Sequence, residues 1–208
     1  MSQIISIEGN IGSGKSTFLS YLKNHNTKFV FVKEPVDEWE SIRDAESGKS
    51  IIEKFYENQE KYSFSFQMMA FISRFSLLRK AIQENPNAII ITERCLYTDK
   101  FVFAKMLFDM KKIEDINYQI YCKWFEEFSQ EIPISKIIYI KTNPITCFSR
   151  IQQRNRKGES VIPLEYLEQC GEYHENMIET LQDSVDIISL DGNVIKTTYE
   201  DWIIQITQ

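Results

Sequence analysis

The chain lacks any run of about 18 apolar residues, the length that predicts a membrane-spanning helix. Neither a basic segment nor an Arg-rich leader precedes the apolar residues that follow Met1, so we expect no signal or transit peptide. Repeats and linkers rich in proline or glycine are also absent. These absences predict a single domain over residues 1–208, located in the cytoplasm and without a membrane partner.

Histidine and cysteine are too sparse to suggest a zinc site. His25 and His174 are the only histidines, and the 4 cysteines lie far apart, without a Cys-x-x-Cys pair. Structural zinc sites use closely spaced His and Cys ligands. We therefore expect the four cysteines to be reduced, buried thiols in a cytosolic protein.

Positive charge is in the minority. The sequence has 24 Lys and Arg against 30 Asp and Glu, for a net charge of −6. Binding nucleic acid through its phosphates needs a dense basic face, so we expect no nucleic-acid partner. A small anionic ligand, held by a few local Arg and Lys side chains, remains compatible with this balance. A content of 43% hydrophobic residues excludes intrinsic disorder.

Short apolar segments alternate with helical patterns along the chain. Strands are predicted over residues 3–7, 29–32, 88–92, 136–141 and 185–190. Helices are predicted over residues 16–24, 37–46, 51–84 (one long helix or two), 97–110, 116–131, 144–157, 164–183 and 199–206. This alternation predicts an α/β fold with a parallel sheet covered on both faces. Because such sheets bind ligands at the carboxyl ends of their strands, the chemistry is expected just after Ile7, Val32, Thr92 and Lys141.

A phosphate-binding loop follows the first predicted strand. The pattern G-x-x-x-x-G-K-S is formed by Gly9, Asn10, Ile11, Gly12, Ser13, Gly14, Lys15 and Ser16. Its backbone N–H groups and the N-terminus of the next helix would bind phosphate. Lys15 would neutralise the β- and γ-phosphates and face solvent without them, while Ser16 would bind Mg²⁺. The alternative is a glycine-rich turn with a solvated lysine.

Charged side chains follow two further strands. Glu34, after the second strand, could accept a proton from an attacking hydroxyl, or could be a surface residue in a turn. After the third strand, Glu93 could hold Mg²⁺ and Arg94 could bind a phosphoryl oxygen or the acceptor. A structural salt bridge is the alternative for these two residues.

Two helical segments carry side chains suited to a nucleotide. Arg150, Arg154 and Arg156 would form a lid that closes on the phosphates and excludes water, unless they form a solvated basic face. The segment 55–75 is rich in aromatic residues, a composition more typical of core than of a pocket. Within it, the amide of Gln67 suits the Watson–Crick edge of a base, because it offers a donor and an acceptor.

Together these motifs resemble the deoxyribonucleoside kinases, the family of deoxycytidine, deoxyguanosine and mitochondrial thymidine kinases. The matching stretches run in the family's order over nearly the whole chain: 9–17, 34–39, 64–67 with 73–74, 93–99, 150–156 and 162–167. The resemblance implies a three-layer P-loop kinase fold, with a five-stranded parallel sheet flanked by helices and an Arg-rich lid. It also implies a homodimer that acts on a deoxynucleoside and a nucleoside triphosphate.

The resemblance implies a role for each matched residue. Glu34 resembles the general base, Arg94 the group that holds the 5′-hydroxyl and the transferred phosphoryl group, and Glu93 the magnesium ligand. Lys15 also belongs to the catalytic set, and the phosphate loop extends to Thr17. The implied substrate-binding residues are Glu34, Trp39, Tyr56, Phe66, Gln67, Arg74, Arg94, Asp99, Phe103 and Glu159.

Within that substrate-binding set, Tyr56 and Glu159 resemble the pair that binds the sugar 3′-hydroxyl, while Gln67 resembles the residue that binds the base edge. Arg74 and Asp99 occupy the positions that sort substrates by base, and as a charged pair they imply deoxycytidine or purine deoxynucleosides over thymidine. The alternative is a structural salt bridge on the helix surface.

Two features depart from the family pattern. Cys95 stands where many members have serine, a change that is nearly isosteric. The donor-base loop at residues 191–193 differs enough that the choice between ATP and UTP stays open.

Three other functions compete with phosphorylation of a deoxynucleoside in nucleotide salvage. A nucleoside monophosphate kinase, such as a thymidylate kinase, would need an extra cation in the acceptor pocket. A nucleotide-binding regulatory subunit would have lost catalysis, yet Lys15, Glu34, Glu93 and Arg94 are all present. A P-loop GTPase or motor would need an Asp at the end of the third strand, where Glu93 and Arg94 stand.

Overall fold

A five-stranded parallel sheet forms the centre of the computed structural model, which describes residues 2–25, 28–154, 161–193 and 199–207. The strands are β1 (Gln3–Glu8), β2 (Val30–Val32), β3 (Ile89–Glu93), β4 (Lys136–Lys141) and β5 (Asp186–Asp191). Their order is β2-β3-β1-β4-β5, and every pairing is parallel. The predicted α/β fold and its sheet are therefore confirmed.

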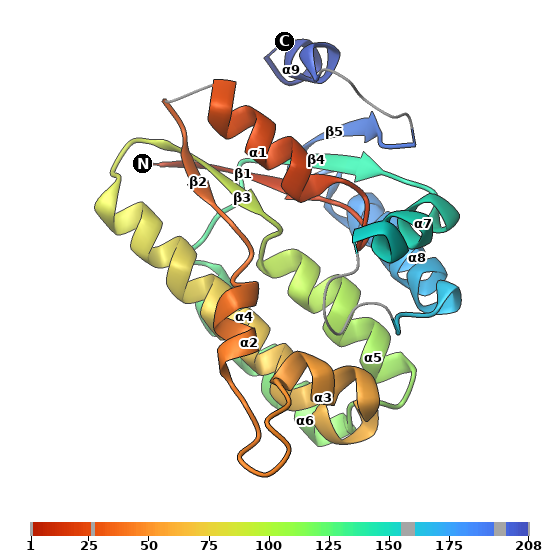
Figure 1. Ribbon diagram of the computed structural model, residues 1–208. Coiled ribbons are helices and arrows are strands. Elements are labelled where there is room, and N and C mark those ends of the chain that lie inside the picture. The colour runs from red at the N-terminus through yellow and green to blue at the C-terminus, as the bar shows by residue number, and fades with distance from the viewer. Residues whose placement is uncertain (1, 26–27, 155–160, 194–198, 208) are drawn as a thin grey trace.

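Helices cover both faces of the sheet and give three layers (Figure 1). On one face, α1 (Lys15–His25) and α9 (Glu200–Thr207) pack Phe18, Leu22 and Trp202 against strand residues such as Ile138. The opposite face is covered by α4 (Gln59–Glu84), the π-helix η1 (Thr98–Ala104), α6 (Asp115–Ser129) and α8 (Leu164–Leu181). The short helix α5 (Lys105–Asp109) continues from η1 and contacts α8. None of the helices that the structure describes is long and apolar enough to cross a bilayer.

The segment predicted as one long helix or two is two helices, α3 (Ile51–Glu57) and α4. Asn58 separates them, and its side chain accepts a hydrogen bond from the Lys61 N–H at 3.1 Å, which caps the start of α4. Ser50 caps α3 in a reciprocal pair with Glu53. Both helices line the same pocket, α3 through Phe55 and Tyr56 and α4 through Phe66.

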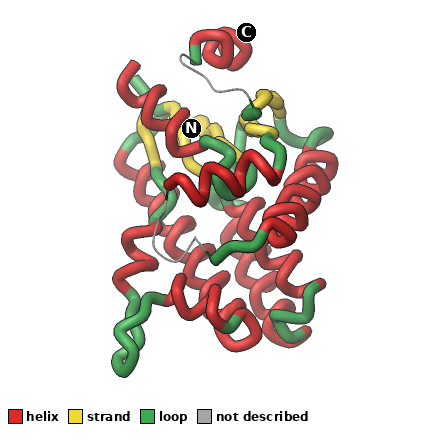
Figure 2. Tube along the Cα trace, turned by 45° about the vertical axis from the view of Figure 1, so that its right-hand side comes forward, coloured by secondary structure: helices red, strands yellow, loops and turns green. Residues whose placement is uncertain are grey.

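The helix predicted over residues 37–46 is shorter, because α2 spans Val36–Ser41. The chain then turns back on itself: Asp44 and Lys49 share a backbone hydrogen bond of 2.9 Å, and the Asp44 carboxylate accepts from the Ser47 N–H at 2.8 Å. Gly48 supplies the positive φ that the turn needs. The resulting loop projects from the molecule (Figure 1 and Figure 2).

The helix predicted over residues 97–110 is in fact η1 followed by α5. The wider turns of a π-helix are rare and are found frequently at functional sites. The last predicted helices before the C-terminus are α7 (Pro144–Arg154), α8 and α9, and residues 155–160 lie outside the described part of the chain.

The four cysteines are free thiols. Cys95, Cys147 and Cys170 are buried as predicted, but Cys122 is only partly buried. The prediction of four buried thiols is therefore wrong for Cys122, whose position on α6 lies between the buried Tyr121 and exposed side chains of the same helix.

Candidate active site

A cavity of about 550 Å³ opens at the carboxyl ends of β1, β2 and β3. Most of the residues singled out from the sequence line it: Ile11, Gly12, Gly14, Lys15, Ser16, Thr17, Glu34, Trp39, Tyr56, Phe66, Gln67, Arg74, Glu93, Arg94, Asp99, Phe103, Arg150 and Arg154. Gly9, Asn10 and Ser13 complete the phosphate loop just behind the cavity wall. Arg156 and Glu159 lie outside the described residues.

Sequence reasoning missed seven residues of the cavity wall, namely Val36, Glu40, Ile52, Phe55, Ala70, Gln153 and Tyr166. Helical spacing could have found several of them. Ala70 lies three residues after Gln67 on α4, and Glu40 lies four residues after Val36 on α2. Residues at these spacings share a helix face.

Two glycines give the phosphate loop its shape. Gly9 has φ 142° and Gly12 has φ 80°, backbone angles that other residues rarely adopt. A Cβ on Gly9 would lie 2.6 Å from the carbonyl oxygen of Ile140, and one on Gly12 would lie 2.6 Å from that of Cys147. The loop is therefore packed directly against β4 and α7, where only glycine fits.

Lys15 points into its own loop. Its Nζ donates to the carbonyl oxygens of Gly9 and Asn10 at 3.1 and 2.8 Å, and the residue is buried. Burial lowers the pKa of Lys15 to about 8, and the charge of Arg94 acts in the same direction. The expectation that Lys15 faces solvent is wrong, because the glycine turns direct two carbonyl groups at the ammonium.

Glu34 and Arg94 are paired at the centre of the site. Arg94 Nη1 donates to Glu34 Oε1 at 2.8 Å. Burial alone would raise the pKa of Glu34, but the charges of Arg94, Arg74 and Lys15 outweigh it and lower that pKa to about 2. Glu34 is thus an ionised carboxylate at neutral pH, partly buried in the pocket.

Arg94 has a strained backbone, with φ 63°. Its N–H donates to the carbonyl oxygen of Ile7 at 3.0 Å, and its carbonyl oxygen accepts from the Thr92 hydroxyl at 2.9 Å. The buried carboxylate of Glu8 accepts from the next N–H, that of Cys95, at 2.9 Å. These contacts hold the turn after β3 in the conformation that directs Arg94 into the cavity.

Ser16 and Glu93 form the only pairing of a phosphate-loop hydroxyl with a carboxylate among the described contacts, at 2.6 Å from Oγ to Oε1. Both are hard oxygen donors of the kind that Mg²⁺ prefers. No group of three or more His, Cys, Asp or Glu suited to a metal occurs in the described ranges. The donor set thus fits a Mg²⁺ ion that takes its other ligands from water and phosphates.

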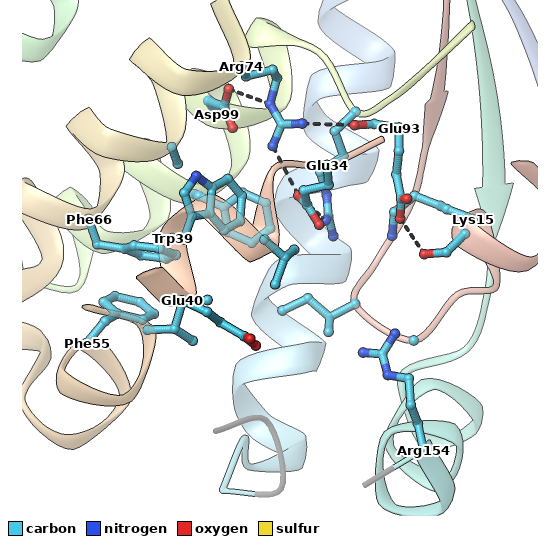
Figure 3. Close-up of a pocket in the computed structure, with 18 of the residues that line it drawn as sticks. Lys15, Glu34, Trp39, Glu40, Phe55, Phe66, Arg74, Glu93, Asp99 and Arg154 are labelled. Carbon is cyan, nitrogen blue, oxygen red and sulfur yellow. Dashed lines mark hydrogen bonds and ion pairs between the residues drawn. The ribbon is translucent and has the colours of Figure 1, made fainter. Parts of the chain in front are cut away.

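The far end of the cavity is lined by aromatic rings (Figure 3). Trp39 and Phe66 meet edge to face with centroids 5.5 Å apart, and Trp39 Nε1 donates to Ser73 Oγ at 2.8 Å. Gln67 is buried beside them, and its Oε1 has no hydrogen-bond partner among the described residues. A buried amide oxygen of this kind can accept a hydrogen bond from a planar ligand held between the rings.

Arg74 and Asp99 form a buried ion pair, with 2.9 Å from Nε to Oδ2. Each side chain is only 2% exposed, so the alternative of a salt bridge on the helix surface is wrong. Burial raises the pKa of Asp99 to about 6, although the charge of Arg74 opposes it. The negative charges of Glu34 and Glu8 act in the same direction as burial, and Glu34 also contacts Arg74 at 3.0 Å.

The lid arginines stand on α7, across the phosphate loop. Arg150 Nη1 donates to the carbonyl oxygen of Ser13 at 3.2 Å, and the exposed Arg154 reaches the cavity mouth (Figure 3). At the adjacent edge of the sheet, Asn193 Oδ1 accepts from the Asn143 N–H at 2.7 Å. The predicted donor-base loop at residues 191–193 therefore lies beside the end of β4, outside the cavity wall.

Comparisons with known proteins point to one family. A sequence model of the family described as deoxynucleoside kinase matches residues 5–207. Human deoxycytidine kinase (Homo sapiens) is 32% identical over 232 residues, which cover 98% of this chain and 89% of that protein. The mitochondrial deoxyguanosine kinase of Xenopus laevis is 31% identical over 191 residues, covering 84% and 72%. Deoxycytidine kinase 2 of Gallus gallus is 33% identical over 205 residues, covering 89% and 77%.

Proposed function

This chain belongs to the deoxynucleoside kinase family, and on that premise we propose that it transfers the γ-phosphoryl group of ATP or UTP to the 5′-hydroxyl of a deoxynucleoside. It is a nucleotide-dependent phosphotransferase with the P-loop kinase fold, and its place is in nucleotide salvage. The residue assignments rest on one observation: Glu34, Arg94 and the phosphate loop line the same cavity.

The donor's phosphates bind the N–H groups of the phosphate loop. Lys15 exchanges its two carbonyl partners for phosphate oxygens, and Arg150 and Arg154 approach the same oxygens from α7. Ser16 and Glu93 would hold Mg²⁺, which when bound would offset the negative charge of the phosphates. Residues 1–208 supply all of these groups as one kinase domain.

Glu34 accepts the proton of the 5′-hydroxyl while Arg94 binds the transferred phosphoryl group. A carboxylate with a pKa of about 2 is a weak base, because a general base acts best when its pKa is near the working pH. When Arg94 turns from Glu34 to the phosphoryl oxygens, Glu34 loses its nearest positive charge and becomes more basic. Arrival of the donor therefore activates the base.

The nucleobase lies between Trp39, Phe66 and Phe103. The free Oε1 of Gln67 and the carboxylate of Asp99 accept hydrogen bonds from an exocyclic amino group. Thymine has a carbonyl group at that position and a methyl group beside it, so it would leave these acceptors unpaired. Deoxycytidine and purine deoxynucleosides are therefore preferred over thymidine.

The sugar lies beside Tyr56, which packs edge to face on Tyr166 with centroids 6.5 Å apart. Tyr56 and Glu159 bind the 3′-hydroxyl, and the two rings fill the space that a 2′-hydroxyl would need. A ribonucleoside is therefore a poor acceptor.

We propose a homodimer that uses an apolar stripe on the outer surface. Ile116, Ile120 and Trp124 recur every four residues on α6 and are 65%, 41% and 46% exposed, and Ile72 on the adjacent α4 is 39% exposed. A second copy of the stripe would cover these side chains. Ile120→Asp should give a monomer in sedimentation equilibrium, whereas Ile145→Asp, at an exposed position on α7, should not change the mass.

The free thiols of the chain support a reducing compartment, so we place the protein in the cytoplasm.

One assay tests the proposed function: initial rates with the four natural deoxynucleosides, cytidine and deoxycytidine monophosphate, each with ATP and with UTP. We expect phosphate transfer to deoxycytidine or a purine deoxynucleoside, slower transfer to thymidine and little to cytidine. Faster turnover of the monophosphate would identify a nucleoside monophosphate kinase instead. A wild-type preference for thymidine would overturn the base assignment and leave the kinase assignment intact.

A further inference from the structure

The guanidinium of Arg74 donates three hydrogen bonds to other residues in the absence of substrate. Its Nε donates to Asp99 Oδ2 at 2.9 Å, its Nη1 to the carbonyl oxygen of Glu93 at 2.8 Å, and its Nη2 to Glu34 Oε1 at 3.0 Å. The guanidinium thus touches the base end of the cavity through Asp99 and the phosphoryl-transfer end through Glu34 (Figure 3).

We propose that Arg74 is a positioning residue that orients the carboxylate of Glu34 to accept the proton of the 5′-hydroxyl as that hydroxyl attacks the γ-phosphoryl group, in addition to any role in base selection. This inference rests on the proposed function, because it assigns Arg74 to the same reaction. On this inference the buried side chain of Arg74, which is 2% exposed, serves both the base end and the phosphoryl-transfer end of the site.

Both arginines use the same oxygen of Glu34. Arg94 Nη1 lies 2.8 Å from Oε1 and Arg74 Nη2 lies 3.0 Å from it, so neither ion pair uses Oε2. An acceptor hydroxyl can therefore donate to Oε2 while Oε1 stays anchored. Fixing one oxygen of a carboxylate defines where the other points, and orientation of this kind contributes strongly to rate.

The two anchors differ in what else they can do. Beyond Glu34, Arg94 has only weak contacts among the described residues: its Nη2 lies 3.5 Å from the carbonyl oxygen of Gly9, and its guanidinium lies 5.1 Å from the ring of Phe103. Neither contact is an ion pair, so Arg94 can turn toward the phosphoryl group. Arg74 is held by Asp99 and by the backbone of Glu93, and its guanidinium also lies 6.0 Å from the ring of Trp39. When Arg94 engages the donor, Arg74 keeps Glu34 in place.

A double-mutant cycle tests the proposal. Arg74→Met, Glu34→Gln and the double variant are assayed for kcat and KM with deoxycytidine and with thymidine. If Arg74 acts through Glu34, Arg74→Met lowers kcat by about 10- to 100-fold in the wild-type background, and by a similar factor for both bases. In the Glu34→Gln background it should lower kcat by less than about threefold, because the group that it orients is gone.

Gln67→Met is the matched control. Gln67 lies on the same face of α4 and lines the same cavity, but in the described part of the chain no hydrogen bond joins it to Glu34 or Arg74. Its effect should depend on the base, appear mainly in KM, and multiply with that of Glu34→Gln. Arg74→Lys, which keeps one cationic donor, should recover part of the kcat lost in Arg74→Met.

The outcomes separate the inference from the proposed function. If the losses of kcat caused by Arg74→Met and Glu34→Gln multiply in the double variant, the inference is overturned. A general folding defect of Arg74→Met would give this same result, because it would lower kcat equally in both backgrounds. An unchanged kcat of Arg74→Met with its preferred base would also overturn it. A wild-type protein that phosphorylates no deoxynucleoside would instead overturn the proposed function.

Discussion

The acceptor half and the donor half of the site satisfy their charges in different ways. In the acceptor half, around β2, β3, α4 and η1, side chains pair with one another across elements: Glu34 with Arg94 and Arg74, and Arg74 with Asp99. In the donor half, around the phosphate loop and α7, cations are satisfied by backbone carbonyls. Lys15 and Arg150 each donate to oxygens of the loop itself.

This difference indicates which half has its side chains in place before ligands bind. Buried ion pairs between elements fix side-chain positions, because breaking one leaves an uncompensated charge. The pairs of Arg74 with Asp99 and with Glu34 therefore preorganise the acceptor half, as the stabilisation of a transition state requires. Arg94 is the exception, because it can leave Glu34 for the phosphoryl group while Arg74 keeps Glu34 paired. In the proposed reaction, neutral carbonyl groups would hold the cations of the donor half only until phosphate oxygens, which are stronger acceptors, replace them. On this proposal the triphosphate would complete its own site.

The largest expected effect breaks the acceptor half. Glu34→Gln keeps the shape of the side chain but removes the base, so kcat should fall by roughly 10²- to 10⁴-fold. The dissociation constant of the deoxynucleoside, measured by calorimetry without the donor, should change little. Near-normal turnover of this variant would remove Glu34 from the mechanism.

A smaller loss is expected in the donor half. Lys15→Ala removes a cation from the transferring phosphate, and kcat should fall by roughly 10²- to 10³-fold. The fold should survive, because the two carbonyls left by Lys15 lie in a loop that borders the cavity, and circular dichroism should match that of the wild type. Wild-type rates in this variant would contradict the phosphate-loop assignment.

Local sequence patterns predict the donor half more completely than the acceptor half. The phosphate loop is one continuous motif whose glycine spacing specifies its conformation, and the end of β1 supplies its position. The strand ends that carry Glu34 and Arg94 were also predictable, because parallel strands bring their carboxyl ends to the same edge of the sheet. Their pairing at 2.8 Å agrees with that expectation.

What the sequence could not predict depends on contacts between distant segments. The inward turn of Lys15 results from the direction of two carbonyl groups. The three contacts of Arg74 join segments that are 19 to 40 residues apart. The π-helix η1 has wider turns than an α-helix, but it spans only 7 residues, too few for the apolar spacing to distinguish the two.

Base selection sharpens the comparison, because it lies wholly in the acceptor half. The double variant Arg74→Met with Asp99→Ala removes both charged partners and enlarges the space for a methyl group. The ratio of kcat/KM for thymidine to that for deoxycytidine should rise roughly 10- to 100-fold. Absolute turnover should fall for both bases, because Glu34 also loses a contact. An unchanged ratio would exclude Arg74 and Asp99 from base selection. As a control on the donor half, the ratio of the rates with ATP and with UTP should stay that of the wild type.

The smallest effect concerns His174 of α8, which lies between the two halves, with ring centroids 6.3 Å from both Phe103 of η1 and Tyr139 of β4. Burial lowers the pKa of His174 to about 3, and the charge of Arg94 acts in the same direction. Because the unfolded chain takes up this proton near pH 6.5 and the native protein does not, native stability falls as the pH decreases from 6.5 toward 3. Between pH 6.5 and 5.5 the loss from this group should be about 1 kcal/mol.

Asp99 changes stability in the opposite direction over part of this range. Its pKa is raised to about 6 by burial, so the native protein takes up that proton first, and native stability rises as the pH falls through 6. The test therefore compares two proteins. The free energy of unfolding in urea is measured at pH 6.5 and 5.5 for the wild type and for His174→Gln, and the contribution of Asp99 cancels because both proteins contain it. Gln can still donate to the carbonyl oxygen of Cys170, which His174 Nδ1 contacts at 2.6 Å. The variant should lose about 1 kcal/mol less than the wild type on acidification, and equal losses would show that His174 is protonated in the native protein.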